Sequence, residues 1–521
     1  MRNITKSLYL LLISITLFAA SCSPSVNSDY LNVLPDDVSA LTSVNIQNIL
    51  DKSQVTENET LKSLILPQLK AVMPAKEYSK VSDVINNFSE LGLETNAPIV
   101  FAVDSKGNVM AVAKVSDIDK LKEGVELMTE NKITDSAIED AGDFEYVYDK
   151  DDYIMAFNSS VLVVKDISRR ETIEQKVAEL KADFARTLAP ATEGSFVNST
   201  NFKNFWAKKG DIKFLGSTKI ADSRQMAMAT MFLPDYFGRN DEVTCIAGIR
   251  FEEGEAIVEI EPIFSNENLN GIVNDNFKTL KNISGDALSM LPGSVAGCVV
   301  LGLDGAKIAA TIAESTKLSS FLSKSDIKKA EQYAMGLEGD LTLAITGFEN
   351  DMPTFAVITK LQDASLIDLV SSFLGSARGV QIEKIEGKEC AYKLSQRNFG
   401  ELYYGISNGY GYASNSAELV EGVGTKVTNS LADAQMIENF DSGLFAMCID
   451  GEKALEFFKA ANRSSRLHQL ATLALDPIDY AEVTVENKGN TTIKVVFDDK
   501  KTNSLQQIMN IFIATAMQRG F

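Results

Sequence analysis

Short apolar runs alternate with polar turns along this chain, and the clearest of them predict β-hairpins. One hairpin is expected to join 98–103 to 109–115 through the polar turn 105–108 (SKGN). Another is expected to join 341–345 to 354–360. Glycine or asparagine in such a turn adopts a positive φ at little cost, which favours a tight reversal between two strands. The pattern therefore predicts antiparallel β-sheet.

Apolar residues at three- and four-residue spacing follow these hairpins and predict amphipathic helices. Ile118, Leu121 and Val125 mark one apolar stripe, and Ile367 and Val370 mark another. Side chains at this spacing share one side of a helix, which packing onto a sheet buries. Hairpins interleaved with helices, without a regular βαβ rhythm, predict an α+β fold of mostly antiparallel sheet. We expect the helices to pack on one face of each sheet.

The same succession of elements occurs twice, which predicts an internal duplication. The matching segments are 34–40 (LPDDVSA) with 291–297 (LPGSVAG), 92–94 with 336–338 (both GLE), 204–205 with 439–440 (both NF), and 223–230 with 465–472, where Ser-Arg and Ala-Thr keep the same spacing. Each copy then ends in a predicted hairpin. We therefore expect two tandemly duplicated halves, 30–283 and 284–521.

Length and composition are those of a globular protein with more than one domain. Single hydrophobic cores stop growing at about 250–300 residues, and this chain has 521 residues, of which 45% are hydrophobic and 23% charged. The formal net charge is −21, spread without a long acidic block. A surface this acidic repels nucleic acid phosphates and anionic lipid headgroups. Nucleic acid is therefore not among the expected partners.

The first 22 residues have the pattern of an export signal. Arg2 and Lys6 form a positive end, residues 8–18 are almost wholly apolar, and three small residues precede Cys22. This arrangement predicts a signal peptide over 1–21, because the apolar run is too short for a membrane span. A cysteine at the cleavage point resembles the lipobox of bacterial lipoproteins, which implies lipidation of Cys22 by a diacylglycerol. An ordinary signal peptide followed by a chance cysteine is the alternative.

The residues after this cysteine bear on the location of the protein. Residues 22–29 are short and polar, and we expect them to tether the first fold to the membrane. Lipoproteins sent to the cell surface in Bacteroidetes resemble one another in carrying acidic residues soon after the lipidated cysteine, whereas residues 23–27 (SPSVN) are uncharged here. The resemblance therefore implies an outer-membrane lipoprotein that faces the periplasm, with surface exposure as the alternative.

The sequence offers no metal or cofactor signature. His468 is the single histidine, and one histidine does not build a His-rich metal site. A Ser-His-Asp arrangement would need this residue, yet its counterpart in the first half is Met226. The segment 409–414 (GYGYAS) lacks the third glycine of a dinucleotide fingerprint. We therefore expect no catalytic residues, no cofactor-binding residues and no metal ligands.

Two groups of residues leave a glycan-directed role open. Acidic side chains gather at two predicted hairpin turns, 149–152 and 252–255, and paired carboxylates are the catalytic groups of most glycosidases. Tyrosines are dense over 403–412, and exposed aromatic side chains bind sugars in some proteins. Charged hairpin turns and strand aromatics are common, so we favour structural roles for both groups.

Four further cysteines are spaced widely along the chain. Cys245, Cys298 and Cys448 lie in apolar, strand-like runs, and Cys390 does not. Free cysteine is among the most buried residue types, so we favour buried thiols. An exported protein lies in an oxidising compartment, which keeps a disulfide open as the alternative.

The lipobox, the LPxxV-type opening of each half, the length and the duplicated hairpin plan together resemble an uncharacterised family of Bacteroidetes lipoproteins, a domain of unknown function. The resemblance covers the whole mature chain and implies export and lipidation, but it carries no site residues.

We expect a lipid-anchored, non-catalytic binding or scaffold protein at the periplasmic side of the outer membrane. It would contact the membrane through the lipid on Cys22, and its further partner would be another envelope protein or a glycan. The alternatives are a glycan hydrolase that acts through acidic residues, and a periplasmic assembly or chaperone factor, which would expose apolar grooves.

Overall fold

The computed structural model describes residues 28–54, 91–130, 133–167, 171–187, 195–217, 243–264, 279–314, 323–349, 352–375, 380–386, 390–396, 400–462 and 464–518. The chain divides into two compact units. The first unit comprises Met1–Asn266 together with Lys501–Phe521, and the second unit comprises Glu267–Lys500. The expected signal peptide over 1–21, Cys22 and most of the expected tether lie outside the described residues.

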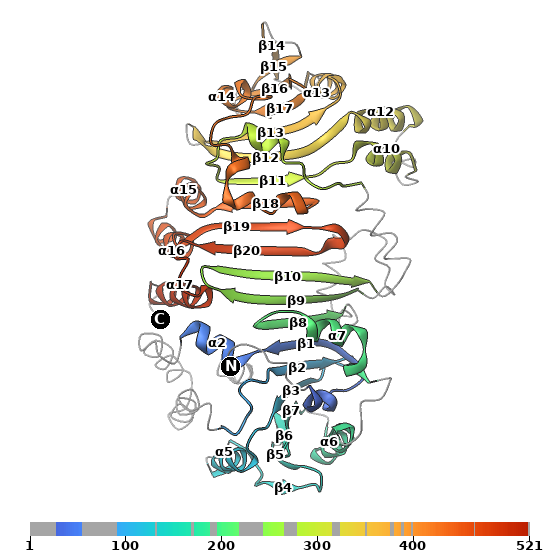
Figure 1. Cartoon of the computed structure of the whole chain (residues 1–521), viewed down its shortest axis with the longest axis vertical. Coiled ribbons are helices and arrows are strands. Elements are labelled where there is room, and N and C mark those ends of the chain that lie inside the picture. The colour runs from blue at the N-terminus through green and yellow to red at the C-terminus, as the bar shows by residue number, and fades with distance from the viewer. Residues whose placement is uncertain are drawn as a thin grey trace. The chain divides into compact units, whose positions relative to one another are not determined.

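The first unit contains an antiparallel sheet, in which every pair of neighbouring strands runs in opposite directions (Figure 1). In order across this sheet the described strands are β4 (Glu139–Asp140), β5 (Glu145–Asp149), β6 (Tyr153–Phe157), β7 (Val161–Asp166), β3 (Val109–Lys114), β2 (Ile99–Asp104), β1 (Val38–Val44), β8 (Ile212–Ser217), β9 (Val243–Glu252) and β10 (Glu255–Phe264).

The second unit contains a sheet with the same strand order. Its described strands, also all antiparallel, are β14 (Gln381–Lys384), β15 (Ala391–Gln396), β16 (Gly400–Ser407), β17 (Tyr410–Ser414), β13 (Met352–Leu361), β12 (Leu337–Glu349), β11 (Gly297–Leu301), β18 (Phe445–Asp450), β19 (Ile478–Val485) and β20 (Thr491–Phe497). In each unit the first strand therefore lies inside the sheet, paired with the second and the eighth.

The predicted fold class is confirmed, because both units combine antiparallel sheet with helices. The two hairpins expected from the sequence are β2–β3 and β12–β13. In the first of them Gly107 has a φ of 88°, the left-handed conformation that glycine adopts without strain. Local turn chemistry therefore placed these hairpins correctly.

The described helices of the first unit are η1 (Asp29–Val33), α2 (Ile46–Ser53), α5 (Ile118–Glu130), α6 (Ile173–Thr187), η3 (Phe196–Asn198), α7 (Thr200–Ala207) and α17 (Ser504–Gln518). Short polar side chains cap the free N–H groups at the start of some of them. The side chain of Asn45 accepts a hydrogen bond from the N–H of Asn48 at the start of α2, and Ser199 does the same for Phe202 at the start of α7.

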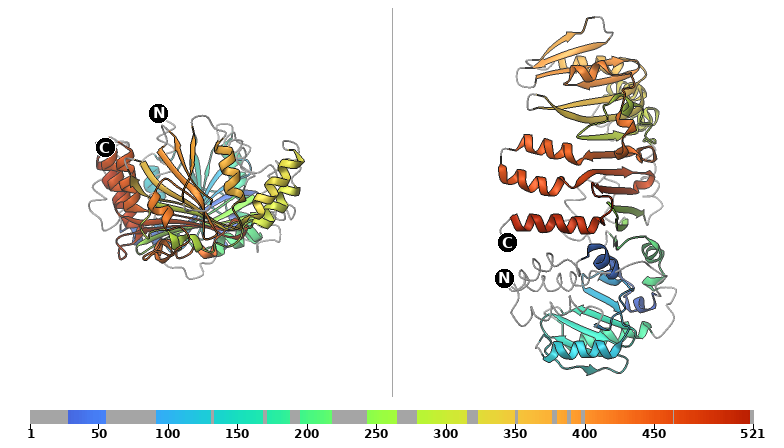
Figure 2. Two further views of the ribbon diagram at one scale, coloured as in Figure 1. Left: turned by 90° about the horizontal axis from the view of Figure 1, so that it is seen from above. Right: turned by 60° about the vertical axis from the view of Figure 1, so that its left-hand side comes forward.

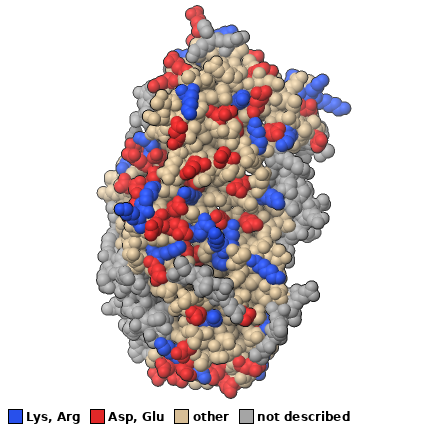
Figure 3. Space-filling model, viewed as in Figure 1, with Lys and Arg blue, Asp and Glu red and all other residues tan. Residues whose placement is uncertain are grey.

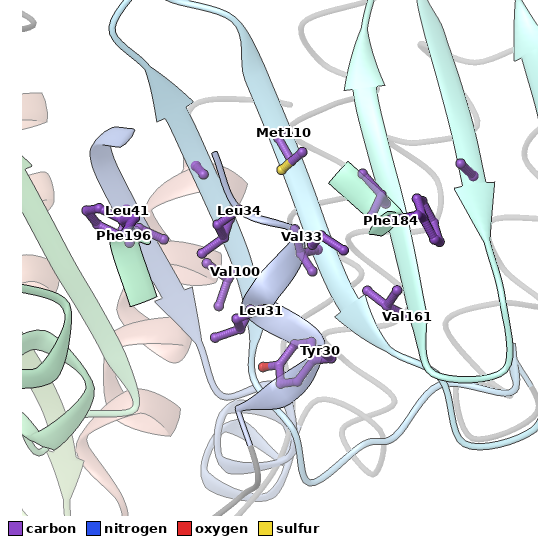
Figure 4. Close-up of a cluster of buried hydrophobic side chains, with 14 of the residues drawn as sticks. Tyr30, Leu31, Val33, Leu34, Leu41, Val100, Met110, Val161, Phe184 and Phe196 are labelled. Carbon is purple, nitrogen blue, oxygen red and sulfur yellow. The ribbon is translucent and has the colours of Figure 1, made fainter. Parts of the chain in front are cut away.

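One face of the first sheet packs against η1, α6 and α7. Figure 4 shows part of this core, with Tyr30, Leu31 and Val33 of η1 and the following residue, Leu34, set against the strands and Phe184 of α6 nearby. The Tyr30 hydroxyl donates a hydrogen bond of 2.6 Å to the carbonyl of Pro98, and burial raises the pKa of this phenol. The segment that opens the described chain is therefore part of the core.

The opposite face of the first sheet packs against α2, α5 and α17. Leu505 and Met509 of α17 join a cluster that includes Phe251 of β9. Asn503, just before this helix, donates a hydrogen bond of 2.9 Å from its side-chain amide to the carbonyl of Phe251. The last helix thus follows the final strand of the second unit in sequence but completes the core of the first.

These two cores correct the expectation that helices cover one face of each sheet. In β2 the neighbouring residues Ile99 and Val100 point to opposite faces, and their exposed fractions are 6% and 0%. Continuous apolar runs of this kind are typical of strands that are covered on both faces.

The second unit buries one face of its sheet in a core that contains η5 (Asp286–Met290), α14 (Ala417–Glu421), η6 (Leu431–Asp433), η7 (Gln435–Ile437) and η8 (Phe440–Ser442). Its other elements are α10 (Gly305–Glu314), α12 (Lys324–Met335), α13 (Ser365–Gly375), α15 (Gly451–Ala461), α16 (Ser465–Leu475) and η9 (Asn487–Gly489). Within this unit α10 and α12 lie near one end of the strands, and α15 and α16 lie near the other end (Figure 1 and Figure 2).

The boundary between the compact units falls at residues 266 and 267, whereas the sequence placed the repeat boundary at 283 and 284, and residues 501–521 belong to the first unit. The match at 223–230 lies outside the described residues. Within the described ranges, none of the helices has the length and apolar character that crossing a bilayer would require.

Candidate functional site

The most distinctive surface of the second unit is an exposed apolar patch on three adjacent strands. Strand β11 pairs with β12 on one side and with β18 on the other. The apolar side chains that point to the uncovered side of these strands include Val299, Leu301, Leu341, Leu343, Met447 and Ile449. We call these six residues the apolar face.

Strand register makes this face continuous. Val299 lies directly opposite Leu343 on one neighbour and Met447 on the other, and Leu301 lies opposite Leu341. Residues opposite each other in an antiparallel pair share one side of the sheet, with their β-carbons about 4.5–5.5 Å apart. The six side chains therefore form one surface rather than scattered exposed residues.

Exposure separates the two sides of these strands sharply. Leu341, Leu343 and Ile449 are 36%, 42% and 40% exposed, whereas Val300 and Ala446, at alternate positions on the same strands, are fully buried. A contiguous exposed apolar surface on a folded protein commonly marks a site of interaction.

The corresponding surface of the first unit is covered. There the pair Val44–Ile99 occupies the place of Leu301–Leu341, at the end of the first strand opposite the second. Val44 and Ile99 are only 5% and 6% exposed. They pack in one cluster with Ile46 of α2, the first residue of the helix that follows the strand.

The helix that follows β11 does not provide an equivalent cover. Its first residue is Gly305, whereas α2 begins with Ile46. A β-carbon on Gly305 would lie 2.3 Å from the carbonyl oxygens of both Ala334 and Leu337, so no side chain fits there. Helix α10 packs on α12 instead, and the Leu301–Leu341 pair stays open.

A small polar pocket in the same unit is the second candidate. Its space, part of which is open to solvent, measures about 170 Å³, and it is lined by Ser284, Asp286, Ala287, Gly339, Asp340, Lys360 and Tyr410. Oδ2 of Asp340 accepts hydrogen bonds from the backbone N–H of Ser284 and of Gly285, both 2.8 Å long, and from the Ser284 hydroxyl at 2.9 Å. Oδ1 has no hydrogen-bond partner among the described residues.

This pocket suits a structural role better than catalysis on a glycan. Pockets for drug-sized ligands usually measure about 300–1,000 Å³, which is larger than this space. Asp340 is 4% exposed, and its three hydrogen bonds hold the turn at 284–285 against strand β12. Asp286 is the only other carboxylate that lines the pocket.

His468 has a capping role. Its Nε2 lies 2.5 Å from the carbonyl oxygen of Asn462, the residue that follows α15, and its own backbone N–H donates to the carbonyl of Ser464. The histidine therefore joins the end of one helix to the start of the next. Among the described residues, no three metal-ligating side chains of histidine, cysteine, aspartate or glutamate come together. Met226 lies outside the described residues.

The two acidic hairpin turns belong to the first unit. Asp149 accepts a hydrogen bond of 3.0 Å from the N–H of Asp151 within the β5–β6 turn. Glu252 and Glu255 flank the β9–β10 turn, where Gly254 has a φ of 71°. Acidic and basic side chains are interspersed over the surface seen in Figure 3.

The tyrosines of 403–412 are strand residues. Tyr404 and Tyr412 are 2% and 5% exposed, and Tyr392 stacks on Tyr404 with ring centroids 5.4 Å apart. Tyr403 donates a hydrogen bond of 2.6 Å to Glu401. This arrangement fits the structural role that the sequence favoured.

The four described cysteines are all thiols, and two of them meet. Cys298 of β11 and Cys448 of β18 lie directly opposite each other and are 2% and 0% exposed. Cys245 and Cys390 are partly buried.

Sequence reasoning missed the apolar face. The signal was present: 298–301 (CVVL) and 341–345 (LTLAI) are nearly continuous apolar runs rather than alternating ones. Such runs indicate strands that are apolar on both faces. The sequence did not show that one of those faces would lack a cover.

Comparison with known proteins gives a family but no activity. A family model described as "Domain of unknown function (DUF4836)" matches residues 30–505. No curated protein matches the chain. A solved structure titled "Structure of crystal form I of TP0453" has 10% sequence identity and a TM-score of 0.25, over 50% of this chain and 87% of its own.

Proposed function

The chain belongs to the family described as Domain of unknown function (DUF4836), and from that premise we propose that it is a lipid-anchored binding protein of the bacterial cell envelope. In this proposal the apolar face of the second unit binds an amphipathic helix of another envelope protein. The exposure of Leu341, Leu343 and Ile449 is the observation that carries the proposal.

The proposed anchor is a diacylglycerol on Cys22, at the periplasmic side of the outer membrane. It is supported by the positive end, short apolar run and small residues that precede this cysteine. Each acyl chain contributes about 0.8 kcal/mol per buried CH₂ group, so two or three chains hold a protein firmly to a bilayer. The uncharged residues 23–27 support the periplasmic side.

Helix packing on the first sheet supports an amphipathic helix as the partner of the apolar face. One face of that sheet accepts α17, a helix that comes from a distant part of the sequence and packs Leu505 and Met509 near Phe251. The apolar face lies on β11, β12 and β18, the counterparts of β1, β2 and β8, and in the first unit another helix, α2, packs over Val44 and Ile99 at that place. Because the chain carries a net charge of −21, a helix with basic flanks would be attracted and an acidic one repelled.

The proposed role is non-catalytic. The pocket that contains Asp286 and Asp340 is small, and one oxygen of Asp340 is already committed to three hydrogen bonds. An assembly or chaperone factor would use the same apolar face, and it is a variant of the proposed binding role.

A peptide titration tests the proposal. The probe is a synthetic amphipathic helix with a leucine stripe and lysine flanks, and its control has glutamate flanks. We expect the full chain to bind the basic peptide, and Leu343→Glu to weaken binding about 10- to 100-fold, because burying a leucine contributes about 1.5–3 kcal/mol. Leu127→Glu, at a leucine of α5 that is 57% exposed, is the matched control and should bind like the unmodified chain.

Equal affinity for both peptides, or equal loss in the two variants, would contradict the proposal. The anchor has its own test. Cys22→Ala should release the protein from sedimented membranes, and a variant that still sediments with them would contradict lipidation.

A further inference from the structure

Cys298 and Cys448 occupy the centre of the second sheet. They lie opposite each other on β11 and β18, and both point into the core on the side away from the apolar face. They are separated widely in sequence, so only the pairing of these two strands brings them together.

The first unit has two leucines at the same place. Leu41 of β1 lies opposite Leu215 of β8, and both belong to the core. Leu41 and Cys298 are the eighth residues of the two matching openings that begin at Leu34 and Leu291. A buried leucine pair in one unit is therefore replaced in the other by two side chains that are smaller and able to bond covalently.

Backbone geometry suits a bond between these cysteines. The N–H of Gly302 donates to the carbonyl of Leu444 at 2.9 Å, and the N–H of Asp450 donates to the carbonyl of Ala296 at 3.2 Å. Because hydrogen-bonded pairs recur at every second residue, Cys298 and Cys448 form such a pair, with their Cα atoms about 5.5 Å apart. Disulfides join Cα atoms about 4.4–6.8 Å apart and Cβ atoms about 3.5–4.5 Å apart. The Cα spacing of this pair is therefore suitable, and its Cβ atoms, about 5.5 Å apart in a hydrogen-bonded pair, must approach by about 1 Å when the bond forms.

We propose that Cys298 and Cys448 form a cross-strand disulfide in the exported protein, and that Cys245 and Cys390 stay as thiols. The compartment in which the bond forms rests on the proposed export of the chain, but the pairing of the two cysteines does not. The bond connects β11 to β18, the described pairing that joins β18, β19 and β20 to the rest of the second sheet.

The reaction is a thiol–disulfide exchange with an oxidised dithiol oxidoreductase or, in vitro, with oxidised glutathione. Two S–H bonds of the chain break and one S–S bond forms, and the two electrons and two protons pass to the oxidant, whose disulfide becomes two thiols. The hydrogen bond that the Cys298 thiol donates to the sulfur of Cys448, together with burial, raises the pKa of Cys298. Since the thiolate is the attacking species, the exchange takes place before β11 and β18 close over the cysteines.

The experiment has two arms that use the full chain. In the first, protein is extracted from cell envelopes into denaturant with an alkylating reagent, and its peptides are analysed by mass spectrometry without reduction. In the second, purified protein is reduced, unfolded and refolded with a mixture of oxidised and reduced glutathione. We expect a linked 298–448 peptide in both arms, with Cys245 and Cys390 alkylated.

Variants show whether the disulfide stabilises the second unit. Reduction should lower the denaturant midpoint of the second unit, and the double change Cys298→Leu with Cys448→Leu, which recreates the leucine pair of the first unit, should abolish this redox shift. The matched double change Cys245→Ala with Cys390→Ala should retain it.

The outcomes are distinct. Alkylated Cys298 and Cys448 in both arms would overturn the disulfide. A linked peptide after refolding, with free thiols in the envelope extract, would support the pairing and contradict the proposed export.

Discussion

The two units arrange ten described strands in the same order, yet they differ in what covers and fills the central strands. In the first unit Val44 and Ile99 lie under α2, whereas Leu301 and Leu341 of the second unit are open. The shared order is what the predicted duplication requires, and the duplication itself stays a prediction. The comparison shows that a strand order can persist while the cover over one face of the sheet changes.

The largest expected loss in the free energy of unfolding comes from breaking the contacts that hold α2 over the first sheet. Asp211, which precedes β8, is ion-paired to Lys52 of α2 at 2.9 Å and accepts a hydrogen bond of 2.8 Å from the N–H of Phe251. Leu444 precedes β18 at the corresponding place in the second unit, where no such pair is possible. The ion pair therefore distinguishes the covered unit from the open one.

Asp211→Ala should lower the free energy of unfolding of the first unit by about 3–5 kcal/mol, because it leaves a partly buried ammonium group without its partner. Trp206, the single tryptophan, lies in α7 of this unit, so its fluorescence during denaturant unfolding measures the loss. Glu456→Ala, which breaks the exposed pair with Lys453, should cost about 0–1 kcal/mol. Similar losses in both variants would contradict the assigned role of Asp211.

The second prediction compares equivalent apolar side chains. Ile99→Ala should cost about 2–5 kcal/mol because it opens a cavity in a closed core. Leu341→Ala should cost about 1 kcal/mol or less, because Leu341 is 36% exposed and its loss leaves little enclosed space. Denaturant unfolding followed by circular dichroism measures both variants, and equal costs would show that the second face is covered after all.

The third prediction concerns the glycine that diverts α10. Gly305→Ala should destabilise the second unit by about 1–3 kcal/mol, since the new methyl group overlaps two carbonyl oxygens and the helix must shift. Gly124→Ala in α5, where nothing lies within 4 Å of the added carbon, should stabilise the first unit by about 0.5–1 kcal/mol. Unchanged hydrogen exchange of α10 and α12 in Gly305→Ala would show that a side chain at residue 305 does not force α10 to shift.

The smallest effect is a pH dependence confined to the first unit. Lys213 of β8 lies opposite Ser43, where the second unit has the apolar pair Ala446 and Val300. Burial lowers the pKa of Lys213 from 10.5 to about 8, although its ammonium group donates a hydrogen bond of 2.7 Å to the carbonyl of Trp206.

Between pH 8 and 10.5 the unfolded chain therefore binds more protons at this lysine than the folded unit does. Stability should rise with pH through this window, and the full penalty should apply below pH 8. Lys213→Met should flatten the rise in unfolding curves monitored by Trp206 fluorescence. A slope that survives this substitution would assign the pH dependence to another group.

Local features of the fold could be predicted from the sequence. The β2–β3 hairpin follows from its turn residues, and the start of α17 at Ser504 follows from Asn503, whose side chain accepts a hydrogen bond of 3.0 Å from the N–H of Leu505. These features depend on residues close together in sequence, whose conformational preferences are largely independent of the rest of the chain.

Features that depend on distant residues were not predictable. The return of α17 to the first unit and the meeting of Cys298 with Cys448 both depend on which strands pair and in what register, and register is set by the whole buried face. The apolar face likewise depends on the missing side chain at Gly305. A sequence pattern identifies apolar residues, but only the packing shows which of them stay exposed.

Carbene footprinting of the full chain, with and without the basic amphipathic peptide, tests the central claim most directly. The account predicts that Leu341 and Leu343 are labelled several times more than Val44 and Ile99, and that the peptide suppresses this labelling while leaving Leu127 unchanged. Equal labelling of the two pairs, or labelling of Leu341 and Leu343 that the peptide does not alter, would contradict it.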